Sequence, residues 1–189
     1  MDLLFVRHGS TRWNGERRFQ GQTDVPLDEP GRAQARALAR TLHSEAFGRI
    51  VSSDLQRALE TARAIAGPRT VEAEPRWREF AFGAWEGRTV DEVDSGINPR
   101  LYAPPGGETF EHVRARVREA LDGIGTGPGR VLIVTHAGPL HAMLDLLFGE
   151  VPFRFEPASL TQVRRGARGA KLLSLGVSAE QYAALLPLR

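Results

Sequence analysis

Residues 3–9 read Leu-Leu-Phe-Val-Arg-His-Gly, and residues 131–138 read Val-Leu-Ile-Val-Thr-His-Ala-Gly. Each segment is a short apolar run that leads into a histidine and then into small residues. Such runs are typical of parallel strands buried on both faces. In an open α/β sheet, ligands bind beyond the carboxyl ends of the strands, at a topological switch point. If the two strands are neighbours, His8 and His136 converge on one site at that edge.

Outward from these segments, strands and helices are predicted to alternate. Further strands are expected at 50–51, near Val71, at 160–163 and at 172–175, the last two forming a hairpin through 164–171. Helices are expected after an Asp28 N-cap, after a Ser53–Gln56 capping box, from Thr109 to Ile124, over 140–148 and over 179–186. The alternation predicts an α/β fold of three layers, α/β/α, with a mostly parallel central sheet.

Length and composition narrow the class of protein. The 189 residues predict a single domain over 1–189. With 41% hydrophobic and 25% charged residues, the chain is typical of a globular protein rather than a disordered one. The absence of cysteine excludes a disulfide scaffold, a thiol nucleophile and a cysteine-ligated metal. No apolar run reaches ~18 residues and no signal-peptide layout opens the chain, so we expect a cytoplasmic protein without membrane contact.

An irregular stretch at about 75–108 interrupts the alternation. It is rich in proline and glycine but also holds Trp77, Phe80, Phe82 and Trp85, which favour burial. We therefore expect a lobe or lid over the sheet rather than a linker. Substrate specificity is expected to lie within 80–108.

The chain is basic because of arginine, since Lys171 is the only lysine among 25 basic residues. The net charge is nevertheless only +2, so the pI of about 9.6 is weak evidence for a nucleic-acid surface. Arg164, Arg165, Arg168 and Lys171 lie together on the expected hairpin without aromatic neighbours. This pattern favours a solvated turn, and we expect no nucleic-acid partner.

Two kinds of site could use the paired histidines. A metal site is disfavoured because Arg7 and Arg57 would repel a cation and no carboxylate stands at ligand spacing. The other histidines lie on predicted helices without a zinc-protease pattern: His43, His112 and His141. An anion site fits better, since Arg57 falls in the first turn of the helix expected to be capped at Ser53, where phosphate is favoured. We therefore expect no metal and no cofactor.

Five ordered blocks over residues 3–145 resemble the histidine phosphatase superfamily, also called the phosphoglycerate mutase-like family. The blocks are Arg7-His8-Gly9 with Thr11 to Ala35, Ser52 to Ala62, Glu79 to Gly87, Pro105 to Glu108, and Thr135 to Gly138. The resemblance implies the phosphoglycerate mutase-like fold. It also implies that His8 is a nucleophile that becomes phosphohistidine, and that Glu79 is the general acid and then the base.

The resemblance implies further contacts to the phosphoryl group and substrate. Arg7, Arg57 and His136 would bind the phosphoryl oxygens. The other implied contacts are Thr11, Asn14, Gln20, Gly21 and Ala137. Two arginines and a histidine can offset the charge of the transferred group without a metal.

The predicted function is therefore a metal-independent phosphomonoesterase that acts on a small phosphorylated metabolite. A cofactor-dependent phosphoglycerate mutase is the alternative, but no arginine follows Glu79 until Arg88, which leaves few cations to retain a bisphosphate. A catalytically idle phospho-ligand binding module is the second alternative, although such a module would lose His8 or Glu79.

Two points stay open at this stage. Relatives commonly carry Glu or Gln where this chain has Ser10, so the contacts of that side chain are not carried over. The hairpin edge is open to pairing with a second copy, which makes a homodimer one further expectation.

Overall fold

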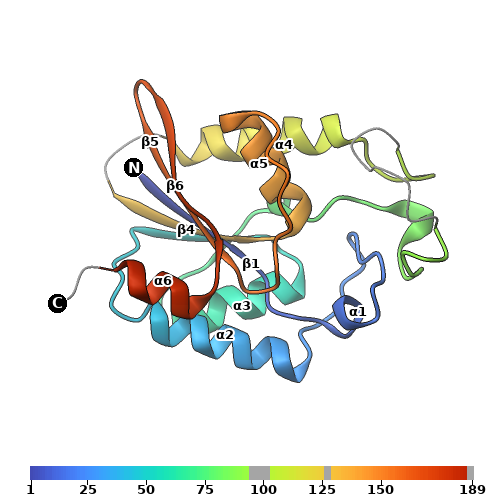
Figure 1. Cartoon of the computed structure of the whole chain (residues 1–189), viewed down its shortest axis with the longest axis horizontal. Coiled ribbons are helices and arrows are strands. Elements are labelled where there is room, and N and C mark those ends of the chain that lie inside the picture. The colour runs from blue at the N-terminus through green and yellow to red at the C-terminus, as the bar shows by residue number, and fades with distance from the viewer. Residues whose placement is uncertain (94–102, 126–128, 187–189) are drawn as a thin grey trace.

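A single mixed sheet forms the centre of the computed structural model (Figure 1). The structure describes residues 1–93, 103–125 and 129–186, and within them six strands lie in the order β3-β2-β4-β1-β5-β6. The strands are β1 (Asp2–Arg7), β2 (Arg49–Ser52), β3 (Glu72–Ala73), β4 (Arg130–Thr135), β5 (Leu160–Gly166) and β6 (Gly169–Val177). Strands β3, β2, β4 and β1 are parallel, whereas β5 runs antiparallel to both β1 and β6. The predicted mostly parallel sheet is confirmed.

Helices cover both faces of this sheet, as the three-layer prediction requires. Figure 1 shows α4 (Phe110–Ile124) and α5 (Ala137–Phe148) on one face, and α2 (Glu29–Thr41), α3 (Gln56–Ala66) and α6 (Ala179–Leu185) on the other. Alternate side chains of β1 feed the two cores: Leu3 and Phe5 pack with α4 and α5, whereas Leu4 and Val6 pack with the opposite helices. Both faces of β1 are therefore apolar, which explains its continuous hydrophobic run.

Two predicted helix starts are confirmed and one is wrong. The Asp28 carboxylate accepts from Gly31 N (2.7 Å) at the start of α2, and Thr109 caps α4. Helix α3 has Leu55, not Ser53, at its N-cap position. The first amide of α3, Gln56 N, donates instead to the Asp24 carboxylate (2.7 Å), a cap supplied from 32 residues away that local spacing cannot reveal.

Other boundaries differ from the predictions by a few residues. Helix α5 begins at Ala137, three residues before the predicted start, and β3 comprises Glu72–Ala73 rather than Val71. The hairpin is confirmed, but its strands continue to Gly166 and from Gly169. Arg164 and Lys171 are therefore paired strand residues (β5–β6) and not part of the turn. Helix α1 (Arg12–Gly15) was not predicted.

The irregular stretch packs its aromatic residues as expected. Trp77 is fully buried, with its ring 5.8 Å from that of Phe5 on β1, and Phe80 and Trp85 are also buried. Two 3₁₀ turns, Pro75–Trp77 and Gly83–Trp85, are its regular elements among residues 75–93 and 103–108. The predicted bounds 75–108 also include 94–102, which lie outside the described residues.

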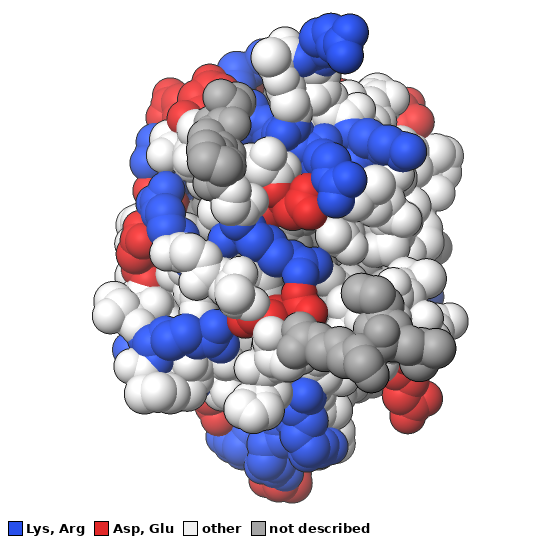
Figure 2. All heavy atoms as spheres, turned by 90° about the vertical axis from the view of Figure 1, so that its left-hand side faces the viewer, with Lys and Arg blue, Asp and Glu red and all other residues white. Residues whose placement is uncertain are grey.

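Charged side chains of both signs share the face shown in Figure 2, which is seen from the left-hand side of Figure 1. Arg164 forms an ion pair with Asp2 (2.7 Å), and Arg165 donates to Leu121 O (2.8 Å). Two of the four basic residues of the hairpin, Arg164 and Arg165, therefore have partners within the protein. The expectation of no nucleic-acid partner stays a prediction.

Each helix of the described ranges is too short or too polar to cross a membrane.

Candidate active site

The two strand-end histidines meet at one edge of the sheet. Strands β1 and β4 are parallel neighbours with Arg7 opposite Thr135, and His8 N donates to Thr135 O (2.9 Å). This register places the His8 and His136 rings side by side, with their centroids 4.9 Å apart. Both side chains are buried. The predicted convergence is confirmed.

His8 is held as a neutral imidazole with one nitrogen free to react. Its Nδ1 lies 2.7 Å from Gly9 O, and a carbonyl can only accept, so Nδ1 carries the proton and Nε2 presents its lone pair. Burial lowers the pKa of His8 well below its ordinary value, and the charges of Arg57 and Arg7 lower it further. The Gly9 carbonyl opposes this shift but does not reverse it.

His136 is neutral for the same reasons. Burial first, then the Arg57 charge and His8, lower its pKa well below the ordinary value. Its Nε2 lies 2.8 Å from Ser53 Oγ. Ser53 Oγ accepts from Leu55 N (3.3 Å), and as a hydroxyl it also carries one proton that it can donate to Nε2. When Ser53 donates to Nε2, the proton of neutral His136 is on Nδ1, an atom without a hydrogen-bond partner in the described part of the chain.

Two arginines flank the histidines. Arg57, in the first turn of α3 as predicted, is fully buried and donates to Gly21 O (2.7 Å) and Thr23 O (3.0 Å). Burial lowers its pKa to about 10 against the opposing charges of Glu79 and Asp24, so it stays cationic at neutral pH. Arg7 donates through one terminal nitrogen to the backbone carbonyl of Phe155. Among residues 1–93, 103–125 and 129–186, the Nε atoms of both arginines are buried without a partner.

Glu79 reaches the site from the irregular stretch and lies against the start of α5. Its Oε1 accepts from Phe80 N (2.8 Å) and from Gly138 N (2.9 Å). These two backbone amides fix the Glu79 side chain at the start of α5. A Cβ at position 138 would come within 2.3 Å of Glu79 Oε1, so glycine is required for this approach.

An ion pair between Arg116 and Glu108 holds the backbone around Glu79. Arg116 of α4 donates to Arg78 O (2.6 Å) and Glu79 O (3.0 Å), and it pairs with Glu108 (2.9 Å). The other oxygen of Glu108 accepts from Ala81 N (2.9 Å). No sequence signal marked Arg116, because its contacts with the Arg78 and Glu79 carbonyls span 38 and 37 residues.

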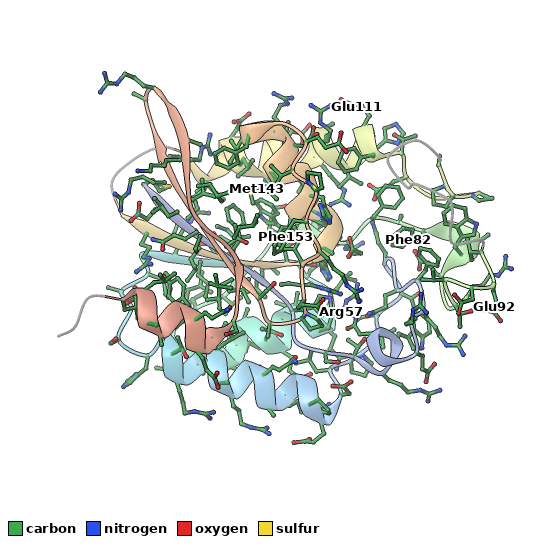
Figure 3. The ribbon with its side chains drawn as sticks, in the orientation of Figure 1. Arg57, Phe82, Glu92, Glu111, Met143 and Phe153 are labelled. Carbon is green, nitrogen blue, oxygen red and sulfur yellow. The ribbon has the colours of Figure 1, made fainter. Side chains whose placement is uncertain are left out.

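The site contains a cavity of about 140 Å³. Of the predicted site residues, seven line it: Arg7, His8, Asn14, Gln20, Gly21, Arg57 and Glu79. Arg18 and Phe19, which the sequence reasoning did not assign to the site, also line it, as does Phe82 from the stretch 80–108 that was expected to determine specificity. Figure 3 shows that Arg57 and Phe82 reach the site from different elements, α3 and the irregular stretch.

Three predicted residues lie around this cavity rather than on its wall. His136 contacts His8, and Ala137 follows it as the first residue of α5. Thr11 is buried and caps α1, where its N–H (3.0 Å) and hydroxyl (3.1 Å) both donate to Asn14 Oδ1. Because the Asn14 oxygen accepts these bonds, its amide NH₂ is the part that can donate to a ligand. The direct substrate contacts of Thr11 and Ala137 stay predictions.

Within the described ranges, no group of three histidine, aspartate or glutamate side chains is arranged to hold a metal ion. The groups gathered at this edge of the sheet are two neutral imidazoles, two buried guanidinium groups and one carboxylate.

The lowered pKa values of His8 and His136 predict an acid-sensitive fold. Below their ordinary pKa of about 6.5, the unfolded chain binds protons at both histidines, whereas the folded chain does not. The free energy of unfolding should therefore fall as the pH decreases, by up to about 1.4 kcal/mol per pH unit for each histidine. Urea unfolding between pH 7.5 and 5 measures this slope.

The control for this measurement is the double variant His8→Asn, His136→Asn. It should lose most of the slope between pH 7 and 5, while the carboxylates with lowered pKa values act in a more acidic range. Equal slopes for the two proteins would contradict a neutral buried pair.

Comparisons with known proteins show the family and the fold. The model of the histidine phosphatase superfamily (branch 1) matches residues 3–178. A probable phosphoglycerate mutase GpmB of Photorhabdus laumondii is 35% identical over 181 residues, covering 86% of this chain and 84% of that protein.

Two solved structures show the same fold. YhfR of Bacillus stearothermophilus superposes with a TM-score of 0.86 at 34% identity, covering 94% of this chain and 98% of that one. A mycobacterial glucosyl-3-phosphoglycerate phosphatase, solved with VO3, has a TM-score of 0.83 at 31% identity, covering 94% of this chain and 99% of that one.

The family match spans nearly the whole chain, and the solved neighbours include phosphatases. The protein is accordingly an enzyme of the phosphatase type. The chain belongs to the histidine phosphatase superfamily, branch 1.

Proposed function

We propose that the protein hydrolyses a small phosphate monoester, without a metal, through a phosphohistidine intermediate on His8. One observation carries this proposal: three buried nitrogen atoms, Arg7 Nε, Arg57 Nε and His136 Nδ1, lie unpaired among the described residues around a neutral imidazole. Buried donors are normally hydrogen-bonded, so unpaired N–H groups beside the cavity are suited to an anion. The cavity of about 140 Å³ suits a small ester.

In the first step, the lone pair of His8 Nε2 attacks phosphorus as the bond to the ester oxygen breaks. Glu79, in its protonated form, donates a proton to the departing oxygen, so a neutral alcohol leaves. Arg7, Arg57 and His136 donate to the three oxygens of the transferred group and offset the charge that develops on them. The Gly9 carbonyl stabilises the cationic ring through Nδ1–H.

In the second step, water attacks the phosphohistidine. The Glu79 carboxylate accepts a proton from the water as the N–P bond breaks. Inorganic phosphate leaves, and His8 returns to the neutral imidazole while Glu79 regains its proton. One water is consumed per ester.

A mutase activity is the second candidate, because the relative from Photorhabdus is named a probable phosphoglycerate mutase. A mutase must retain a bisphosphate and return its phosphoryl group. Here Glu79 is followed by Phe80, Ala81 and Phe82, so aromatic rings occupy this side of the site. Arg18 also lines the cavity, but its charge is shared with Glu16 (2.6 Å). This composition favours hydrolysis.

Removal of metal ions tests the proposal. Protein dialysed against EDTA should release phosphate from esters at a rate within about two-fold of untreated protein, because no step uses a metal. The panel comprises p-nitrophenyl phosphate, 3-phosphoglycerate, a sugar phosphate and a nucleotide. The mycobacterial neighbour, which is named a glucosyl-3-phosphoglycerate phosphatase, motivates a glycosylated phosphoglycerate as a fifth ester.

Each outcome of the panel is informative. Activity that returns only when a divalent metal is added would overturn the metal-free mechanism. Exchange between 2- and 3-phosphoglycerate that is faster than phosphate release would establish the mutase instead. A cytoplasmic location and a homodimer stay predictions.

A further inference from the structure

A second carboxylate, Glu86, lies beside the site without lining its cavity. One of its oxygens accepts from Gln22 N (3.1 Å) and Phe82 N (3.0 Å). The other accepts from Thr23 N (2.9 Å) and from the Thr23 hydroxyl (2.6 Å). Four donors therefore converge on one side chain, and they join the loop at 21–23 to the irregular stretch that carries Glu79.

The loop that Glu86 holds is the loop that orients Arg57. The terminal nitrogens of Arg57 donate to the carbonyls of Gly21 (2.7 Å) and Thr23 (3.0 Å). Gly21 has φ +55°, and a Cβ there would lie 2.0 Å from the Glu86 carboxylate, so the backbone approaches Glu86 as closely as glycine allows. A continuous set of contacts runs from Glu86 through the loop to the guanidinium.

We infer that Glu86 is a positioning residue for phosphoryl binding, because it fixes the carbonyls that aim Arg57 at the transferred group. This inference rests on the proposed function. A long arginine side chain loses much rotational freedom when it is held in one orientation, and a loop fixed in advance supplies that order before substrate binds. The Glu86 charge also opposes the lowering of the Arg57 pKa, which helps to keep the guanidinium charged.

The contacts require a carboxylate rather than an amide. All four groups around Glu86 are donors, and an ionised carboxylate is a pure acceptor. Glutamine has nearly the same size but would place its NH₂ against backbone N–H groups. Glu86→Gln therefore keeps at most one pair of these contacts and sets its NH₂ against the other pair, with little change in volume.

The control variant is Glu92→Gln, in the same irregular stretch. The Glu92 carboxylate is exposed and accepts from Thr89 N (2.7 Å), so it has the same kind of backbone contact. Figure 3 places Glu92 at the far side of that stretch, away from Arg57. Glu86→Gln should lower kcat/KM by about 10- to 100-fold, whereas Glu92→Gln should stay within about two-fold of wild type.

A double-variant cycle separates positioning from general structural damage. If Glu86 acts through Arg57, its loss matters little once Arg57 can no longer make the two-pronged contact, as in Arg57→Lys. Glu86→Gln should then reduce kcat/KM by less than about three-fold in the Arg57→Lys background. A full reduction in that background would overturn the inference, as would wild-type activity in Glu86→Gln.

Anion binding gives a second readout that does not depend on turnover. Calorimetric titration with vanadate and with inorganic phosphate should show about 10-fold weaker binding to Glu86→Gln than to wild type. Unchanged binding would overturn the role of Glu86. A wild-type protein that binds vanadate but hydrolyses no ester would instead overturn the proposed function, so the two failures are distinguishable.

A milder variant guards against a folding defect in Glu86→Gln. Thr23→Val removes only the hydroxyl contact to Glu86 from an exposed position. It should lower kcat/KM by about two- to five-fold with an unchanged unfolding temperature. No change in kcat/KM would contradict the inference.

Discussion

Replacement of His8 by alanine is expected to lower kcat/KM for every phosphate ester by about 10⁴-fold or more. The variant removes Nε2, the nitrogen whose lone pair is proposed to attack phosphorus, so the first step loses its nucleophile. The arginines and His136 would still bind the ester. The KM, or the affinity for vanadate, should therefore change far less than kcat.

The matched control is His43→Ala. His43 follows α2 and is exposed, away from the cavity, so its loss should leave turnover unchanged. Circular dichroism and thermal unfolding show whether each variant folds. Residual activity of His8→Ala above about one hundredth of wild type would argue that another group, or water directly, attacks phosphorus.

Replacement of Glu79 by glutamine is expected to lower kcat/KM for alkyl phosphates by about 10²- to 10⁴-fold. The glutamine carbonyl can keep the bonds from Phe80 N and Gly138 N, so the segment should stay in place. What is lost is the proton for the departing alkoxide. Stopped assays of phosphate release, with Glu111→Gln as an exposed control on α4, measure this effect.

The leaving group gives a sharper test of Glu79. The p-nitrophenolate ion departs without needing a proton, so the first step should be nearly normal for p-nitrophenyl phosphate. Hydrolysis of the phosphohistidine still needs Glu79 as the base, which predicts a rapid burst of p-nitrophenol followed by slow turnover. Equal losses for alkyl and p-nitrophenyl esters, without a burst, would contradict the role of Glu79 as acid and base.

Local sequence patterns predicted the centre of the site because its geometry follows from two strands. The apolar runs ending at His8 and His136 are buried on both faces, and such strands are parallel neighbours at the middle of a sheet. Once the strands are neighbours, the position of each histidine just past its strand brings the rings together. The resemblance to a known family added Glu79, which no local pattern indicates.

The same local reasoning was wrong where a distant partner determines the structure. Ser53 and Gln56 have the spacing of a capping box, yet Asp24 caps Gln56 and Ser53 contacts His136 across 83 residues. Those contacts depend on tertiary structure, which outweighs a local preference worth about 1 kcal/mol.

The positions of Arg116 and Glu86 were also beyond the reach of sequence patterns. Both residues bind backbone groups of irregular segments, where no periodicity indicates which side chains face inward. The burial of Trp77 and Phe80 was predictable from their apolar character. The path of the chain from Trp77 to Phe82 could not be predicted. Arg116, Glu108 and Glu86 fix that path by binding its backbone groups.

Detection of the phosphoenzyme tests the central claim most directly. Glu79→Gln is mixed with p-nitrophenyl phosphate, quenched in base to preserve a phosphorus–nitrogen bond, and mapped by mass spectrometry of its peptides. The mechanism predicts one phosphoryl group on His8, and none in the double variant Glu79→Gln, His8→Ala. The group on His8 should be lost at the same rate as phosphate is released. A phosphoryl group on another residue, or phosphate release with no modified His8 at any time, would contradict it.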